Sequence, residues 1–268
     1  AATEIDYTMP APHTEAFDGG VYQKRCYFGF GKADPNAELR FGPNITEWPK
    51  IPALADNLLM QVASVLRDPV TTTDELIPSG ETSSYRSNPL KLATFALSRR
   101  DPEYVARANV THALELARQD GLVPPELEAV LSKLLLTNDA AKTMQLGSVI
   151  FAKKPGDGSA REQAASCQKV LGGWANIANE YATKRYRSNL INWGMLPFVI
   201  PEGALPFQNL DYLFLPDIRK AVEEKQSEIT AYVVKGSELK EFKLGLGAMT
   251  DDEREIILKG CLINYYRG

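Results

Sequence analysis

Short apolar runs alternate with helical patterns along most of the chain. The run at 58–66, which is partly β-branched and ends before Pro69, predicts a strand. Residues 148–152 and 196–200 predict two more buried strands, and a short apolar run lies at 174–178. Strands interleaved with helices in this way predict an α/β layered domain.

Helical spacing dominates residues 89–136, where Pro89 suits a first turn and both 101–103 and 124–126 are typical helix starts. We expect a helical insertion there, between two β-rich parts. Further helices are expected to begin at Ser159, to cover residues 182–192, and to begin at Leu215 and, with a capping sequence, after Thr250. Residues 228–235 and 238–244, separated by Gly236 and Ser237, predict a hairpin.

Residues 1–57 differ from the rest because they are rich in proline and glycine and contain few periodic apolar runs. They predict an extended N-terminal arm that wraps another part of the protein. The predicted division is therefore an arm over residues 1–57 and a domain over residues 58–268, with the helical insertion at about residues 89–136.

Composition narrows the class of protein. The chain has 268 residues, of which 44% are hydrophobic and 24% charged, which is typical of a globular protein and excludes disorder as a whole. Lys and Arg number 30 against 34 Asp and Glu, so the formal net charge is −4 and nonspecific binding of nucleic acid or anionic membranes is not expected. No signal peptide or long apolar run is evident, so we expect a cytoplasmic protein without a membrane span.

The cysteines and histidines do not predict a metal site. Cys26, Cys167 and Cys261 are far apart and form no C-x-x-C pair, so we expect small buried or incidental thiols. His13 and His112 lack a second ligand at metal spacing and are expected to be structural.

The segment 156–165, with the sequence G-D-G-S-A-R-E-Q-A-A, is the strongest candidate for chemistry. Its glycines allow close backbone approach to a ligand, and a helix that begins at Ser159 would place positive potential beside the serine hydroxyl. Arg161 adds a permanent charge that can bind a carboxylate. The structural alternative is a capping box, in which Ser159 and Glu162 satisfy the first turn of the helix.

Four blocks in sequence order resemble the C-terminal swivel domain of the aconitase family. They are T-T-D-E at 72–75, the segment 156–165, L-G-G at 171–173 and N-L-I-N-W-G-M-L-P at 189–197. The resemblance extends over about residues 42 to 266. It implies a three-layer β/β/α swivel fold, of the type also found in the small subunit of isopropylmalate isomerase.

The resemblance also implies an activity. It implies a hydro-lyase in which Ser159 is the base that removes a proton next to a carboxylate, Asp74 assists it, and Arg86 and Arg161 hold the carboxylates of a hydroxy di- or tricarboxylic acid. The implied partners are this small acid and the N-terminal domains of the same protein. A [4Fe-4S] cluster held by those domains is the implied cofactor, with none in this chain, which is therefore expected to be inactive alone.

Three positions depart from the family pattern. Ala160 stands at a substrate-binding position usually held by a second serine, Gln163 replaces a histidine, and Glu75 replaces the histidine of T-T-D-H. Each change alters a polar group beside the expected ligand. Citrate and isocitrate are therefore doubtful substrates, and a different hydroxy acid or a catalytically inactive paralogue stays open.

Two other readings remain. The basic run at 184–187 includes an aromatic residue and is compatible with an RNA-binding or other regulatory module, although a short run in an acidic chain is more typical of a solvated or inter-domain face. A free-standing small subunit is the other reading. The long arm and the helical insertion count against it.

Overall fold

The fold comes from a computed structural model, which describes residues 8, 11, 16–25, 31–38, 40–159, 161–235 and 238–267. The chain divides into two compact units, Ala1–Phe41 and Gly42–Gly268. In the described part of the first unit, α1 spans Gly20–Arg25. All the other helices and strands described below belong to the second unit. The segment before its first strand is held by a hydrogen bond from the Leu54 amide to the Leu258 carbonyl (3.1 Å).

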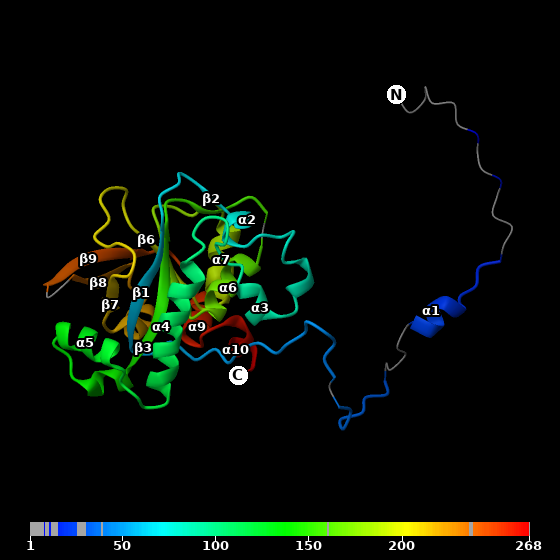
Figure 1. The fold of residues 1–268 in the computed structure, drawn as a ribbon, viewed down its shortest axis with the longest axis horizontal. Helices are drawn as coiled ribbons and strands as arrows, with labels where there is room; N and C mark the ends of the chain where they lie inside the picture. Colours follow the sequence, from blue (N-terminus) through cyan, green and yellow to red (C-terminus); the bar gives the residue numbers. More distant parts are fainter. Residues whose placement is uncertain are drawn as a thin grey trace. The chain divides into compact units, whose positions relative to one another are not determined.

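A closed barrel forms the centre of the second unit (Figure 1), with the strand order β1-β3-β5-β6-β9-β8-β7. The strands are β1 (Asn57–Leu66), β3 (Met144–Ala152), β5 (Gly173–Ala178), β6 (Leu196–Val199), β7 (Tyr212–Leu215), β8 (Glu228–Lys235) and β9 (Glu238–Leu246). β1, β3, β5 and β6 pair in parallel, whereas β7, β8 and β9 pair antiparallel and close the barrel on β1. A separate small sheet joins β2 (Thr71–Thr72) to β4 (Pro155–Asp157).

Side chains that alternate along β3 hold two layers of the domain together. Val149 and Phe151 point into the core between the parallel and antiparallel strands. Ile150 and Ala152 point the other way, into a second core shared with the helices. Because successive side chains of a strand face opposite sides, this strand is buried on both faces. The result is a sheet, sheet and helix layering, so the predicted α/β swivel class is confirmed.

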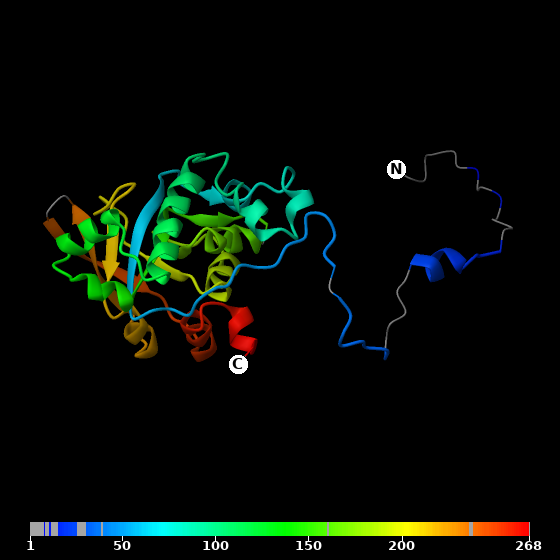
Figure 2. The same ribbon diagram turned by 60° about the horizontal axis from the view of Figure 1, so that its bottom comes forward.

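The helices cover the outer face of the parallel strands and the ends of the barrel (Figures 1 and 2). They are α2 (Thr73–Leu76), α3 (Pro89–Ala93), α4 (Tyr104–Gln119), α5 (Pro125–Lys133), α6 (Gln163–Val170), α7 (Lys184–Asn192), α8 (Ile218–Glu223), α9 (Asp251–Leu258) and α10 (Leu262–Arg267). Helices α3 to α5 lie between β2 and β3 in the chain, where the helical insertion is expected.

Two expected helix starts are wrong. α6 begins at Gln163, not at Ser159, and its N-cap Glu162 makes no side-chain capping bond, so the capping box between Ser159 and Glu162 does not form. Leu215 ends β7 instead of opening a helix, and α8 starts at Ile218. The predicted cap at Thr250 is confirmed as a full capping box with Glu253.

Candidate functional site

The loop that carries Ser159 is fixed by close backbone packing. Gly156 has φ +90°, and a Cβ at this position would lie 2.4 Å from the Tyr186 side chain, so only glycine fits. Further along, the Thr73 hydroxyl donates to the Ser159 carbonyl (2.8 Å). These contacts hold the loop against α2 and α7, and the Ser159 side chain is exposed.

Below that loop, Tyr186 belongs to a closed ring of buried hydrogen bonds. Gln168 Nε2 donates to the Tyr186 hydroxyl (2.9 Å), the hydroxyl donates to Asn176 Oδ1 (2.8 Å), and Asn176 Nδ2 donates to Gln168 Oε1 (2.7 Å). All three groups are thereby satisfied in a dry interior. The ring therefore fixes the side chain on which Gly156 packs.

On the other side of the loop, α2 presents Asp74 and Glu75 in its first turn. Glu75 forms a capping box with Thr72, in which each side chain bonds the backbone amide of the other. Glu75 is also paired with Arg100. The residue that departs from the family pattern at this position thus stabilises the start of α2, while Asp74 is left to face the pocket region.

Asp74 connects the loop to the surrounding cations. Arg161 donates to its Oδ1 (2.5 Å) and Arg99 to its Oδ2 (2.6 Å), and the Ser79 amide and hydroxyl each donate to Oδ1 (3.3 Å). The hydrogen bond from Arg161 is the main cause that lowers the pKa of Asp74, against a smaller opposing effect of burial. Asp74 is therefore ionised at neutral pH, and it neutralises much of the charge of Arg161.

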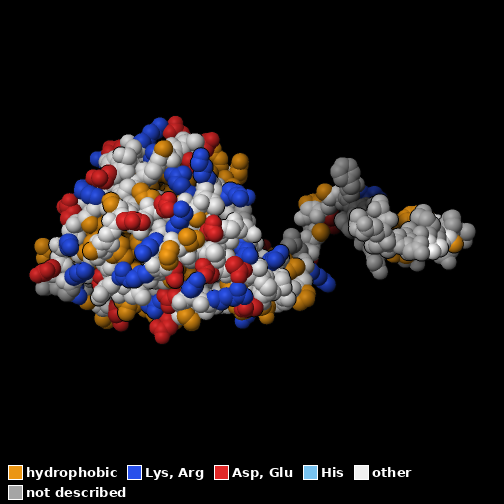
Figure 3. Space-filling model, turned by 90° about the horizontal axis from the view of Figure 1, so that it is seen from above, with side chains coloured by type: hydrophobic (Ala, Val, Ile, Leu, Met, Phe, Trp, Pro, Cys, Tyr) orange, Lys and Arg blue, Asp and Glu red, His pale blue; other side chains and the backbone are white. Residues whose placement is uncertain are grey.

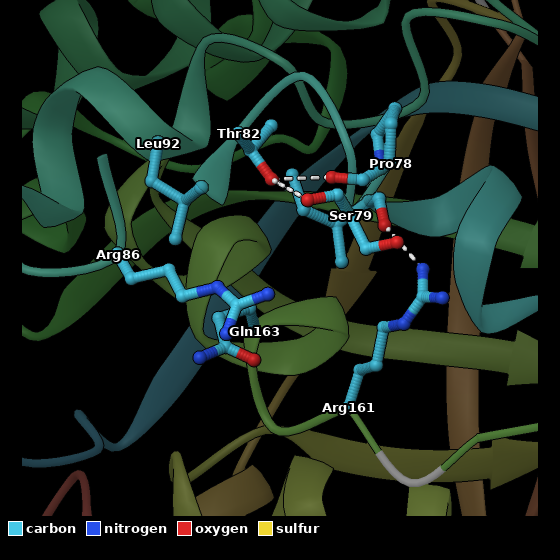
Figure 4. A pocket seen from close by; sticks show the side chains of 8 residues that line it. Pro78, Ser79, Thr82, Arg86, Leu92, Arg161 and Gln163 are labelled. Atoms are coloured by element: carbon cyan, nitrogen blue, oxygen red, sulfur yellow. Dashed lines mark hydrogen bonds between the residues drawn. The ribbon is translucent and has the colours of Figure 1, made fainter. Parts of the chain in front are cut away.

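A pocket of about 230 Å³ lies beside this ion pair. The residues that line it are Ile77, Pro78, Ser79, Thr82, Arg86, Leu92, Arg161 and Gln163. Figure 4 shows Arg86 entering from the side of Leu92 and Arg161 from the opposite side, where it also donates to the Ile77 carbonyl (3.0 Å). None of the residues that line the pocket is acidic, and Arg86 makes no ion pair with any described residue.

The structure brings together three of the five expected site residues, since Arg86 and Arg161 line one pocket and Asp74 is bound to Arg161. Ser159 is adjacent through the loop but does not line the pocket, and Ala160 lies outside the described residues. Gln163 does line the pocket, at the first residue of α6.

Among the pocket residues that the sequence analysis did not name are Thr82 and Leu92. Thr82 donates to the Pro78 carbonyl (2.5 Å) and closes the turn that forms one wall. Leu92 forms another part of the lining from α3. The turn residues at 78–80 could have pointed to Thr82, whereas no sequence signal places Leu92 here.

The described cysteines do not fit an iron–sulfur cluster. Cys167 and Cys261 are both free and buried, and burial raises the pKa of the Cys167 thiol, which disfavours the thiolate that iron requires. Cys26 lies outside the described residues. In the part of the chain that the structure describes, no three His, Cys, Asp or Glu side chains are grouped as a metal site, and we derive no reaction step through a cluster.

The basic run at 184–187 is partly structural. Tyr186 is 2% exposed, so it cannot stack on a base, and Arg187 donates to the Ala248 carbonyl (2.8 Å). Lys184 and Arg185 are exposed. On the face drawn in Figure 3, Lys and Arg side chains are interspersed with Asp and Glu, as on an ordinary solvated surface. Among the described residues, no helix has the length and apolar character that crossing a membrane requires.

With the fold and the pocket described, comparisons with known proteins show what this domain is similar to. Residues 107–203 match the family model described as the aconitase C-terminal domain. This part includes Ser159 and Arg161. The predicted resemblance to the aconitase family, through its C-terminal domain, is therefore confirmed.

One curated protein and one solved structure are among those that match this chain. Aconitate hydratase A of Rickettsia bellii is 23% identical over 228 residues, which cover 76% of this chain and 25% of that protein. The chain thus spans about a quarter of the length of this curated relative. A crystal structure of 3-isopropylmalate dehydratase from Methanocaldococcus jannaschii has a TM-score of 0.49 and 21% identity, covering 79% of this chain and 93% of that one.

Proposed function

We propose that this chain is the substrate-clamping part of an aconitase-type hydro-lyase that acts on a hydroxy di- or tricarboxylic acid. The observation that carries the proposal is that Arg86 and Arg161, from separate segments of the chain, line one pocket. Guanidinium groups bind carboxylates in bidentate fashion, and two such groups on one small pocket suit a ligand with more than one carboxylate.

The two arginines have different roles in this proposal. Arg86 has no acidic partner among the described residues and supplies the first carboxylate contact. Arg161 is already paired with Asp74 and anchored to the Ile77 carbonyl, so it is held in place and orients the ligand. Gln163 presents a side-chain amide to the same pocket. This amide suits a hydrogen bond to a neutral hydroxyl or carboxamide group of the ligand better than a contact with a charged group.

In the catalytic step we assign proton transfer to Ser159. Its alkoxide would take the proton from the carbon next to the bound carboxylate, while the hydroxyl group leaves the neighbouring carbon as hydroxide with its bonding electron pair and a double bond forms. Ser159 would then release the proton, which combines with the hydroxide as water, and Asp74 assists through Arg161. A serine is a poor base in water, so this role depends on nearby cations that stabilise its anionic form. Support comes from the resemblance and from the anchored, exposed position of Ser159. We further propose that the chain alone does not turn over substrate, and that the protein is cytoplasmic.

A second candidate function is binding of the same class of acid without catalysis. Ser159 does not line the pocket, and the charge of Arg161 is already compensated by Asp74. Both observations are compatible with a pocket that holds an acid and leaves it unchanged.

Titration calorimetry of this chain with tricarboxylic and monocarboxylic acids tests the binding function. We expect the tricarboxylates to bind, and Arg86→Ala to weaken that binding by about tenfold or more, because a charge-assisted hydrogen bond is lost. Arg185→Ala, which removes another exposed arginine, is the matched control and should bind like the original chain. Equal affinity in the Arg86→Ala variant would contradict the proposal. Turnover by the full-length protein, purified anaerobically, separates the hydro-lyase from the binding function.

A further inference from the structure

A second pocket, of about 540 Å³, lies between α8 and α9. It shares no residue with the pocket of Arg86 and Arg161. The residues that line it are Arg219, Val222, Glu223, Lys225, Asp251, Arg254, Glu255, Leu258 and Lys259. Four of these are cations and three are acids, so the lining carries an excess of one positive charge.

The ion pairs locate that excess charge. Three cations each have an acidic partner: Arg219 with Glu223 (3.1 Å), Lys225 with Asp251 (2.6 Å) and Lys259 with Glu255 (3.3 Å). Arg254 makes no ion pair with any residue that the structure describes. The unpaired charge of the pocket is therefore the guanidinium of Arg254.

Arg254 is also the most deeply buried cation of the pocket, with 8% of its surface exposed. Its Nη1 donates to the Val222 carbonyl (3.3 Å), which fixes one end of the guanidinium. Its Nε is buried with no hydrogen-bond partner. Its Nη2 makes no hydrogen bond to a described residue either. The unused donors are thus Nε and Nη2, which lie on one edge of the guanidinium.

Such an edge has a strong chemical preference. Nε and Nη2 donate in parallel and match two oxygens of a carboxylate or phosphate. A buried charge without a partner destabilises the fold, and a buried donor without an acceptor adds to that cost. An anion on this edge would remove both costs, since the three acids of the lining are already bound to other cations.

We propose that the pocket between α8 and α9 binds a small oxyanion of the phosphate class, held in bidentate fashion by Nε and Nη2 of Arg254. Lys225 and Lys259 stand at the same pocket as additional donors, and Val222 and Leu258 give it an apolar wall that suits the organic part of a phosphate monoester. This inference is independent of the function proposed for the first pocket.

Nuclear magnetic resonance of the chain, labelled with ¹⁵N, tests the site with inorganic phosphate as the probe. We expect the Nε–H signal of Arg254 to shift saturably at millimolar phosphate, and calorimetry to give the same affinity. Acetate at equal concentration should shift it less, because acetate has one charge and fewer oxygens. An unmoved Arg254 signal, or a larger response to acetate than to phosphate, would overturn the phosphate assignment.

Two variants test the residues. Arg254→Met keeps the side-chain volume and removes the charge, and we expect phosphate affinity to fall by about tenfold or more. Because this residue is buried, Lys225→Glu provides a second test in which an exposed side chain is reversed in charge, and the same loss is expected. Lys220→Glu, on α8 but outside the lining of this pocket, is the control and should keep the affinity. Unchanged binding in Lys225→Glu, or equal losses in Lys225→Glu and Lys220→Glu, would overturn the proposal.

Discussion

Arg161 donates a hydrogen bond to Asp74 across 87 positions of sequence, and this contact joins the loop before α6 to the first turn of α2. The two segments resemble separate blocks of the aconitase pattern, and the ion pair shows how the fold unites them. The pair also gives the two pocket arginines different roles in binding. Arg161 is held by Asp74, whereas Arg86 has no acidic partner among the residues that the structure describes.

The ion pair predicts an acid-dependent stability. Asp74→Asn removes a carboxylate whose folded pKa lies below its ordinary value, chiefly through the bond from Arg161. A carboxyl group with a lowered folded pKa stabilises the fold above its unfolded pKa, and this contribution is lost as the pH falls through the folded pKa. Asp74 is 39% exposed, so we expect a loss of less than about 1 kcal/mol at pH 7.

Urea denaturation of Asp74→Asn and of the original chain measures this effect. The difference in free energy of unfolding should be present near neutral pH and shrink below about pH 4, where the carboxyl group of the unfolded chain is protonated. Asp68→Asn, which alters a looser pair with Arg100 (3.7 Å), is the control and should show a smaller difference. A difference that grows toward acid pH would contradict the assigned direction.

The close contact between Gly156 and Tyr186 predicts that replacing Gly156 with a larger residue strongly destabilises the fold. Gly156→Ala combines a positive φ with a collision against a buried ring, and we expect it to lower the free energy of unfolding by about 3 kcal/mol. Gly121→Ala is a close control, because Gly121 has φ +80° but open space around its missing Cβ. Only the backbone strain of about 1 kcal/mol is expected there. Thermal and urea denaturation would measure both, and equal losses would show that Tyr186 does not restrict the position.

The hydrogen-bonded ring around Tyr186 predicts that removing the Tyr186 hydroxyl lowers the free energy of unfolding. Tyr186→Phe leaves Gln168 and Asn176 each without one partner in a dry interior. We expect a loss of about 1–3 kcal/mol in the free energy of unfolding. Tyr232→Phe, which changes a half-buried tyrosine on β8, should stay within about 0.5 kcal/mol. Similar values for the two variants would argue that the ring adds no stability.

Local patterns were sufficient for much of the fold. The run at 58–66 became β1, the run at 148–152 is the end of β3, and Thr250 caps α9 as its sequence predicts. Each of these signals lies within a few residues, where periodicity and capping act. Local patterns could not predict the closure of the barrel, because β1 pairs with β7 between residues far apart in the sequence, such as Leu58 and Leu215.

The resemblance named candidate residues but could not give their geometry. Asp74 and Arg161 lie in two of the matched blocks and Arg86 lies between them, and the structure shows that Arg161 pairs with Asp74 and lines one pocket with Arg86. The expected helix start at Ser159 was wrong and the alternative capping box does not form, because a hydroxyl followed by a glutamate three residues later also occurs outside helix caps. Glu162 instead accepts a hydrogen bond from the Trp193 indole, a partner on a distant segment. The pairing of Arg99 with Asp74 likewise depends on tertiary contacts.

Ser159 gives the prediction that separates catalysis from binding. In the full-length protein, Ser159→Ala should lower turnover by about 10²–10⁴-fold, the range for loss of a general base, and leave the affinity for the acid nearly unchanged. The reason for the second expectation is structural, since Ser159 does not line the pocket and its carbonyl, which the substitution keeps, makes the bond to Thr73. Ser132→Ala, an exposed serine on α5, is the control. Steady-state kinetics and calorimetry on the same preparations would decide. Full turnover in Ser159→Ala would exclude this serine as the base, and a loss of affinity equal to the loss of turnover would make it a binding residue.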